Sequence, residues 1–394
     1  MGSRSDAPLW ILRHHSPSPI HALKLVQLNR NGKEDKRSAF ILAGDSQGRV
    51  SFSSLYDVRP RYFWKAHEKG ILGIDLIELE GKLAILSQGR DNKLHAHQIK
   101  LSNITSLAVL PSRIQDDLIV PPLIWSLDVN ALNYCPMSVL HQLDAKQAGP
   151  LVAIPHTLDS GFIDVIRLSP EERIARAVGQ ADVQSSSSRA QRAPMCMSMQ
   201  LLRCETKEES LRIISGYEDG FIRSWSIRKD GSSNLEWELR KHDESIMSSA
   251  CSQDGKFAVS VGADDIIALY QLKEDHQKAK ITKSRGMGHA SVAIRKDGKV
   301  IAIGGWDGNV RLFDDDLQHS ASLRYHKDTV QAIAFAEAGS IDLKATQEKV
   351  EDIDNFDDED DDELNINGVL GKANNINNLL ITGGKEGRIC IWST

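Results

Sequence analysis

Serine, histidine and aspartate recur together in this chain at a spacing that could assemble a nucleophilic catalytic site. In hydrolases such a trio activates the serine hydroxyl, because histidine accepts its proton and aspartate orients the histidine. Two sets keep serine four residues before aspartate, namely His67, Ser87 and Asp91, and His242, Ser260 and Asp264. A third set uses related residues and adds an indole: His326, Thr382, Glu386 and Trp392.

The recurrence favours a structural role for these side chains. An enzyme does not normally build its nucleophile three times, whereas buried polar groups need hydrogen-bond partners wherever they occur. We interpret the sets as networks that tie connecting loops to hairpins, and we predict no catalytic, cofactor-binding or metal-binding residue. Nucleotide-binding glycine motifs and H-E-x-x-H are missing, and the five cysteines lack metal-ligand spacing. The sequence therefore predicts a protein that is not an enzyme.

The elements that position these residues come from an internal repeat. Small or polar residues, a turn with Asp and Gly, and alternating apolar residues recur at 43–53, 87–97, 155–166, 215–225, 261–270, 304–314 and 383–393. An Asp-Gly turn between alternating segments is typical of a β-hairpin. Three of the intervals between copies are 44, 45 and 43 residues, which is the period of a WD-repeat propeller blade.

The repeat predicts an all-β fold, a single seven-bladed WD-repeat β-propeller over residues 1–394. Each blade needs four strands, and the last copy supplies only the third strand of the seventh blade. We therefore predict that residues 8–13 add the missing strand and close the ring, which removes exposed sheet edges. Four further phrases predict innermost strands at 20–25, 71–76, 129–134 and 330–335.

Wider intervals between copies predict three insertions, at 101–121, 168–194 and 337–376. The second is rich in serine, and Ser169, Pro170 and Glu172 resemble a helix start, so we predict a short helix to about Val178. The third holds ten acidic residues between 351 and 363 and is expected to be disordered. It is interpreted either as a solvated spacer or as a contact for basic partners such as histone tails.

Charge and hydropathy exclude several partners. The formal net charge is −6, and without the acidic insertion the remainder would be slightly positive. A nearly neutral body argues against a reader of duplex DNA, which presents a broad basic face. No apolar run approaches the roughly 18–20 residues needed to span a bilayer. We expect neither nucleic acid nor a membrane as a direct partner.

Four stretches resemble one family of WD-repeat proteins. "KAHEKGILGID" (65–75), "GRDNKLHAHQI" (89–99), "WSLDVNALNYC" (125–135) and "AIPHTLDSGFIDVIRLSPEERIARA" (153–177) are similar to the fungal ASTRA-associated protein 1 family. The likeness extends to its animal relative, the G-protein-β-subunit-like WD-repeat protein. The chain departs from the usual repeat at His97, where a tryptophan is common.

The resemblance implies a non-enzymatic scaffold or adaptor subunit of the nuclear ASTRA assembly. Partners implied by it are the cochaperone trio of phosphatidylinositol-3-kinase-related kinases, RuvB-like AAA+ ATPases and the kinase-like scaffold of histone acetyltransferases. It also implies roles in kinase maturation, chromatin regulation and telomere maintenance, in the nucleus and also in the cytoplasm. The alternatives are a propeller that binds histone tails directly and a generic G-protein-β-like signalling scaffold.

Partner-contact residues are expected on loops and turns of the family-like blades. They are Arg90, Asp91, Asn92, Lys93, Asp128, Asn130, Asp159, Glu171, Glu172 and Arg173. Turn geometry, strand-end hydrogen bonding and helix capping are the structural alternatives for them. The expected channel positions include His21, Asp75 and Asn133 among apolar or small residues, without an acidic or aromatic pocket for a basic tail. This pattern favours the adaptor over the histone-tail reader.

Overall fold

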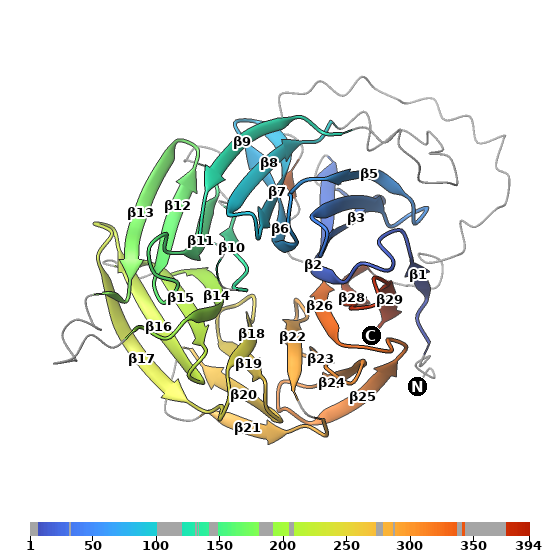
Figure 1. Cartoon of the computed structure of the whole chain (residues 1–394). Coiled ribbons are helices and arrows are strands. Elements are labelled where there is room, and N and C mark those ends of the chain that lie inside the picture. The colour runs from blue at the N-terminus through green and yellow to red at the C-terminus, as the bar shows by residue number, and fades with distance from the viewer. Residues whose placement is uncertain are drawn as a thin grey trace, which may run out of the picture.

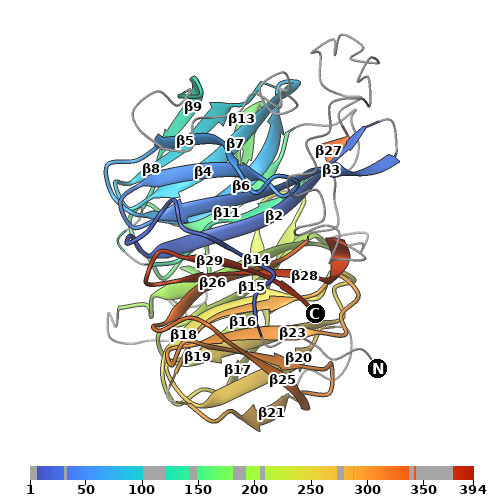
Figure 2. The same cartoon turned by 90° about the vertical axis from the view of Figure 1, so that its right-hand side faces the viewer.

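Alternating apolar residues and glycine turns fold this chain into seven sheets arranged in a ring, as Figure 1 shows. The computed structural model describes residues 7–30, 33–100, 120–130, 132, 134–141, 149–180, 192–204, 209–272, 279–286, 288–336, 341–342 and 376–394. Within these ranges six sheets have four strands, and the sheet that contains β2 (Ile20–Arg30) has five. The seven-bladed β-propeller predicted from the repeat is confirmed, and Figure 2 shows the ring from another side.

The first four blades follow the chain in order. Blade one contains β2 (Ile20–Arg30), β3 (Lys33–Asp45), β4 (Arg49–Ser54), β5 (Pro60–Lys65) and the short parallel β27 (Ile341–Asp342). Blade two contains β6 (Ile71–Leu79), β7 (Lys82–Gly89), β8 (Lys93–Gln98) and β9 (Leu123–Asp128). Blade three contains β10 (Ser138–Leu140), β11 (Leu151–Pro155), β12 (Ile163–Leu168) and β13 (Glu171–Val178). Blade four contains β14 (Cys196–Arg203), β15 (Glu209–Tyr217), β16 (Phe221–Arg228) and β17 (Ser233–Arg240).

The remaining blades complete the ring. Blade five contains β18 (Ile246–Cys251), β19 (Phe257–Gly262), β20 (Ile266–Gln271) and β21 (Lys280–Lys283). Blade six contains β22 (His289–Ile294), β23 (Ile301–Gly305), β24 (Asn309–Phe313) and β25 (His319–Arg324). Blade seven contains β26 (Val330–Phe335), β28 (Leu379–Gly384), β29 (Ile389–Ser393) and β1 (Trp10–Leu12), and a 3₁₀ turn, η2 (Ile376–Asn378), precedes β28.

The repeated glycine turns join the second and third strands of the blades. Gly48, Gly220, Gly308 and Gly387 have φ between 76° and 80°, a conformation that glycine adopts without the clash of a Cβ atom. A Cβ at Gly48 would lie 2.0 Å from the carbonyl oxygen of His67, so the turn also packs tightly on the loop that enters the next blade. In blade two Asn92 fills this position with φ 65°.

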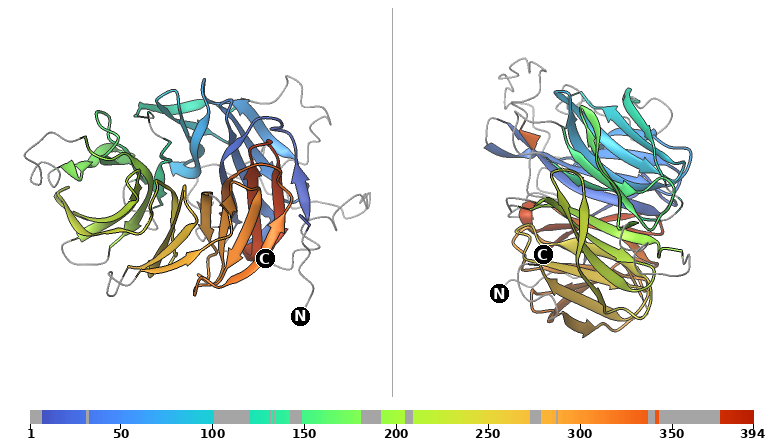
Figure 3. Two further views of the ribbon diagram at one scale, coloured as in Figure 1. Left: turned by 60° about the horizontal axis from the view of Figure 1, so that its bottom comes forward. Right: turned by 90° about the vertical axis from the view of Figure 1, so that its left-hand side faces the viewer.

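The N-terminal strand closes the ring. β1 pairs with β29 in an antiparallel ladder that sets Trp10 opposite Ile391 and Leu12 opposite Ile389. Figures 1 and 3 show this blue strand beside the red strands from the other end of the chain. Leu12 is buried and joins a core cluster that includes Ile20 and Ile41 of blade one. The closing strand therefore seals blade seven and also packs against its neighbour.

The predicted helix in the second insertion is wrong. Residues 171–178 form β13, the outer strand of blade three. Ala175, Ala177 and Val178 are buried while Arg176 is exposed, so the segment has a buried and a solvent-facing side that suit an outer strand. The capping signal at Ser169 and Pro170 instead lies in the turn between β12 and β13.

One predicted innermost strand is also misplaced. Residues 129–134 were expected at the channel as a strand, but the innermost strand of blade three is β10, which begins at Ser138. The phrases at 20–25, 71–76 and 330–335 do lie in the innermost strands β2, β6 and β26. Most of the predicted insertions at 101–121 and 337–376, and the serine-rich residues 181–191, lie outside the described residues. No helix among the described residues is long and apolar enough to cross a membrane.

Candidate functional site

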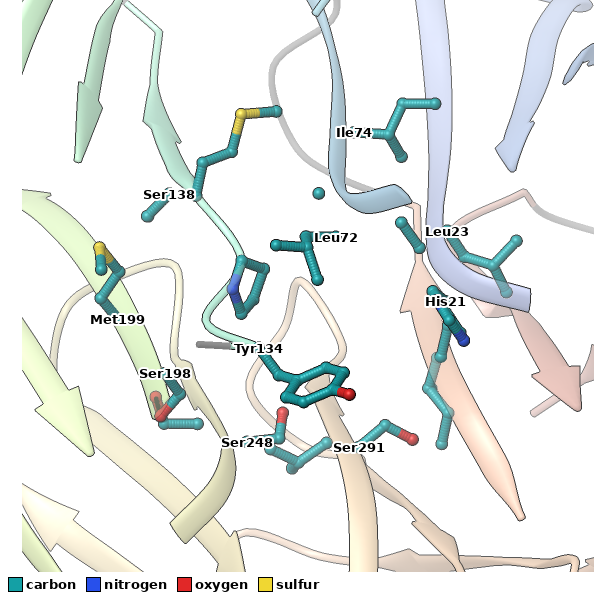
Figure 4. A pocket seen from close by; sticks show the side chains of 18 of the residues that line it. His21, Leu23, Leu72, Ile74, Tyr134, Ser138, Ser198, Met199, Ser248 and Ser291 are labelled. Carbon is teal, nitrogen blue, oxygen red and sulfur yellow. Dashed lines mark hydrogen bonds between the residues drawn. The ribbon is translucent and has the colours of Figure 1, made fainter. Parts of the chain in front are cut away.

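The innermost strands of all seven blades line a cavity of about 490 Å³ on the ring axis. Figure 4 shows side chains from several strands around this space, among them His21, Leu72, Tyr134, Ser138 and Ser291. Its wall includes many serine and methionine side chains, namely Met137, Met197, Met199, Met247, Ser138, Ser198, Ser248, Ser249 and Ser291. His21 and Asp75 line it as expected from the sequence, whereas Asn133 lies outside the described residues.

One tyrosine lies at the channel, for which no aromatic pocket was expected. Tyr134 lines the cavity although 57% of its surface is exposed. It reaches this place from the loop between β9 and β10, because the chain enters β10 later than predicted. Tyr134 thus lines the cavity and is also open to solvent.

The acidic group of the channel is already neutralised within the protein. Asp75 Oδ2 lies 3.4 Å from Lys24 Nζ, and Asp75 Oδ1 lies 3.4 Å from His141 Nε2. Burial alone would raise the pKa of Asp75, but these two partners outweigh it and hold the pKa at about 2. Asp75 is thus a paired carboxylate rather than a free acceptor for a basic tail.

Blades two and five hold the first two predicted networks. His67 Nδ1 lies 2.9 Å from Asp91 Oδ1, and His67 Nε2 lies 2.9 Å from Ser87 Oγ. His242 repeats the pattern, 3.0 Å from Asp264 Oδ1 and 2.7 Å from Ser260 Oγ. Each aspartate also accepts backbone N–H groups, which fixes the loop to the hairpin turn.

Blade seven contains the third set, and burial limits what all three sets can do. His326 lies 2.5 Å from Glu386 Oε1 and 2.8 Å from Thr382 Oγ1, and the Trp392 indole donates to the same hydroxyl at 2.9 Å. Ser87, Ser260 and Thr382 all have no exposed surface. A substrate carbonyl cannot reach a buried hydroxyl, so this geometry holds strands together and does not present a nucleophile.

Two further networks were missed by sequence reasoning. His15 Nδ1 lies 2.8 Å from Asp45 Oδ2 and its Nε2 lies 2.9 Å from Ser51 Oγ, so blade one has a network whose histidine comes from the N-terminal segment. In blade three, His156 Nδ1 lies 2.9 Å from Asp164 Oδ1. Neither network has the regular sequence spacing that marks the other three.

Blades four and six depart from the pattern. In blade four the Trp225 indole donates to Ser215 Oγ at 3.0 Å, and the Tyr217 hydroxyl takes part in place of histidine. In blade six Ile303 occupies the serine position, and Asp307 pairs with Arg311 at 2.5 Å. Both ring nitrogens of the fully buried His289 lack a hydrogen-bond partner there. Burial lowers the pKa of His289 to about 4.

Acidification from pH 7 to pH 5 is expected to destabilise the ring through its buried histidines. Burial also lowers the pKa of His97 to about 4, whereas an unfolded histidine titrates near 6.5. The unfolded chain therefore binds protons below about pH 6.5 that the folded chain excludes until about pH 4. Each of the two histidines should lower the free energy of unfolding by about 1–2 kcal/mol between pH 7 and pH 5. Urea unfolding at pH 7, 6 and 5 measures this loss; equal stability at the three pH values would contradict it.

The predicted partner residues of blade two gather at the β7–β8 turn. The Arg90 guanidinium lies 4.2 Å from the centre of the Tyr134 ring, and Lys93 pairs with Asp128 at the end of β9. Asp91 belongs to the His67 network. Asn92 adopts its positive φ in the turn itself. Asp91 and Asn92 thus have structural roles here, whereas Arg90 remains on the surface without a described carboxylate partner.

The other predicted residues are divided between the two ends of blade three. Asn130 is buried and donates to the His156 carbonyl and Ser160 Oγ, and Asp159 accepts the Gly161 N–H. At the opposite end of β13, Glu171 accepts the Trp125 indole N–H and Glu172 pairs with Arg167. Arg173 lies 3.4 Å from Asp164. The structure therefore does not bring the predicted residues into one site.

Two exposed leucines near these residues were missed. Leu132 is 78% exposed and Leu158 is 83% exposed. Asn130 Oδ1 accepts the Leu132 N–H at 3.0 Å, while its amide nitrogen bonds the 156–160 turn that carries Leu158. The single buried Asn130 therefore joins the segment that carries Leu132 to the turn that carries Leu158. A leucine in a local sequence pattern carries no sign of whether the fold will bury it.

Comparison with known proteins supports the propeller assignment. The family model described as "WD domain, G-beta repeat" matches residues 233–271 and 282–314. These segments cover most of the strands of blades five and six together with β17. No cluster of three or more His, Cys, Asp or Glu residues that could hold a metal ion occurs in the described part of the chain.

Curated relatives match nearly the whole chain. "ASTRA-associated protein 1" of Verticillium alfalfae is 29% identical, with 98% of this chain and 92% of the relative covered. The protein of that name from Aspergillus niger is 26% identical, with coverage of 98% and 96%. The one from Schizosaccharomyces pombe is 23% identical over 86% of this chain and 96% of its own length. The resemblance deduced from the four quoted stretches is confirmed.

Proposed function

We propose that this seven-bladed WD-repeat propeller is a non-enzymatic adaptor subunit of the nuclear ASTRA assembly, where it links cochaperones of phosphatidylinositol-3-kinase-related kinases to chromatin regulation. The observation that carries the proposal is similarity along nearly the whole chain to proteins named for their association with ASTRA. The proposed partners are the cochaperone trio, the RuvB-like AAA+ ATPases and the kinase-like histone acetyltransferase scaffold. The proposed location is the nucleus, with a cytoplasmic fraction.

The ring supports an adaptor rather than an enzyme. The three predicted triad-like networks keep their hydroxyls buried, as does the His15 network of blade one, and the channel carboxylate of Asp75 is paired with Lys24 and His141. The Cys135 and Cys196 thiols are buried as well, and burial raises the pKa of Cys135 well above its usual range. A rigid ring with surface loops suits binding of other proteins, although fold alone does not determine function.

Two sets of charge reversals test the adaptor role in cells. Arg90→Glu with Lys93→Glu changes the β7–β8 turn, and Glu171→Lys with Glu172→Lys changes the far end of β13. Arg173 is left intact because it pairs with the buried Asp164. Tagged full-length variants are purified from cells, and the cochaperone trio is quantified by mass spectrometry. We expect recovery to fall at least about tenfold for one set, with unchanged melting temperatures.

The same purification separates the competing functions. If the parent protein recovers none of the cochaperones and the purified ring binds free histone-tail peptides at micromolar affinity, the histone-tail reader replaces the adaptor. If both sets of variants recover cochaperones as the parent does, the proposed contact residues are wrong. A Lys327→Glu variant is the matched control, because this exposed lysine lies on the loop between blades six and seven.

A further inference from the structure

We propose that Arg90, Leu132, Tyr134 and Leu158 form a docking patch for an acidic peptide segment of a partner protein that also carries an apolar side chain. This inference rests on the proposed adaptor function and specifies the chemistry of one partner segment. The four residues are called the Tyr134 patch below. They come from the β7–β8 turn, the loop between β9 and β10, and the β11–β12 turn.

The apolar part of the patch is exposed and held in place. Eight large hydrophobic side chains in the described part of the chain are exposed, and Leu132, Tyr134 and Leu158 are three of them. Exposed apolar residues that gather on one surface indicate a binding site, whereas isolated ones do not. The hydrogen bonds of Asn130 join the backbone at Leu132 to the 156–160 turn that carries Leu158. This shared anchor lowers the conformational entropy that a ligand would lose in bringing the two segments together.

The cationic part of the patch has no carboxylate of its own. Arg90 stacks on Tyr134 and its Nε atom is buried without a hydrogen-bond partner. The nearby acids are occupied, since Asp91 lies against His67, Asp128 pairs with Lys93 and Asp159 accepts a backbone N–H. Because Nε is buried, an incoming carboxylate would pair with the terminal guanidinium nitrogens of Arg90, which can bind a carboxylate in a two-pronged geometry. Burial lowers the pKa of the channel residue His21, and the charge of Arg90 adds to this effect.

These features favour a peptide over the other occupants of a propeller surface. A second copy of the chain in a symmetric dimer would bring the same cationic and apolar surface against itself. The patch has only a few exposed side chains, whereas a stable interface of two folded proteins buries about 800 Å² on each. A short segment with one acidic and one apolar side chain matches both the charge and the size of the patch.

Selection from a displayed library of random decapeptides on the purified full-length protein tests the specificity. We expect enrichment of Asp or Glu close to Leu, Ile, Phe or Trp. With Arg90→Glu the acidic preference should disappear and Lys or Arg should be selected instead. Enrichment of basic peptides by the parent protein, or the same acidic peptides with Arg90→Glu, would overturn the proposal.

Affinity measurements then locate the site. The most enriched peptide is labelled with fluorescein and titrated by anisotropy against Arg90→Glu, Leu132→Asp and Tyr134→Ala, each of which should weaken binding by at least about tenfold. Lys327→Glu and Trp306→Ala are the matched controls, because they change an exposed cation and an exposed aromatic on other blades. Thermal melting of each variant checks that the ring is intact. Unchanged affinity in all three patch variants would overturn the proposal.

Two further comparisons separate this inference from its alternatives. Removal of residues 345–372 tests the acidic block of the chain itself, and unchanged peptide affinity supports a partner segment. A rise in peptide affinity of more than about threefold would show that the acidic block competes for the patch. The occupant would then be this block and not a partner protein. If the parent protein binds the peptide but recovers no cochaperones from cells, the adaptor role is rejected and the patch stands. If the parent protein binds no peptide but recovers the cochaperones normally, the patch is rejected and the adaptor role stands.

Discussion

Removal of residues 1–13 is expected to lower the free energy of unfolding of the whole ring by about 5 kcal/mol. The deletion takes away β1, its ladder to β29 and the buried side chain of Leu12. It also leaves β29 as an open edge, which can pair with other chains. Urea unfolding followed by circular dichroism gives the free energy, and light scattering detects the association of exposed edges.

A pair of point variants tests whether the effect of the deletion comes from opening the ring or only from shortening the chain. Leu12→Asp places a charge in the cluster with Ile20 and Ile41 and should destabilise nearly as much as the deletion. Trp10→Asp on the same strand should cost much less, because Trp10 is 38% exposed. A deletion variant that melts at the same temperature as the parent would show that β1 does not hold the ring closed.

The ring could be predicted because its determinants are local in sequence. A hairpin turn such as 304–308 needs only a few neighbouring residues, and the positive φ of Gly308 follows from that turn. Repetition then multiplies a weak signal, since seven similar hairpins at a blade-like period leave few alternative folds. The closing strand followed from counting strands within the last blade.

Blade three was predicted less well because its local signals compete. The Ser-Pro-Glu-Glu start at 169–172 suits a helix N-terminus as well as a turn, and the partner strand β12 decides between them through its pairing with β13. Residues 129–134 alternate like a strand, but Asn130 is needed to join two loops. In both places tertiary contacts override a pattern that is real but ambiguous.

Some features of the candidate site could be predicted from the sequence and others could not, for the same reason. The networks of His67, His242 and His326 could be deduced because their spacing repeats along the chain. The Tyr134 patch could not, because it combines three segments that meet only in the folded ring, and Arg90 alone had been singled out from the sequence. The His15 network escaped for a similar reason, since its histidine reaches Asp45 only after the N-terminal segment crosses blade one.

Opposite effects are expected when a satisfied and an unsatisfied polar group are removed. Asp264→Ala should lower the free energy of unfolding by about 1–3 kcal/mol, because the buried His242 and several backbone N–H groups of the loop and turn lose their acceptor. Asp91→Ala should behave similarly in blade two. Urea unfolding at pH 7 measures both, and full stability in either variant would contradict a structural role for the networks.

His289→Leu provides the matched contrast within the same ring. Both nitrogens of His289 are buried without partners, and a buried polar group that makes no hydrogen bond opposes folding. Its replacement by an apolar side chain should therefore leave stability unchanged or raise it by about 1 kcal/mol, and should also remove part of the loss of stability between pH 7 and pH 5. Destabilisation as large as that of Asp264→Ala would mean that His289 has a partner in the folded protein. The sign of this one substitution thus distinguishes a histidine that organises its blade from one that blade six merely tolerates.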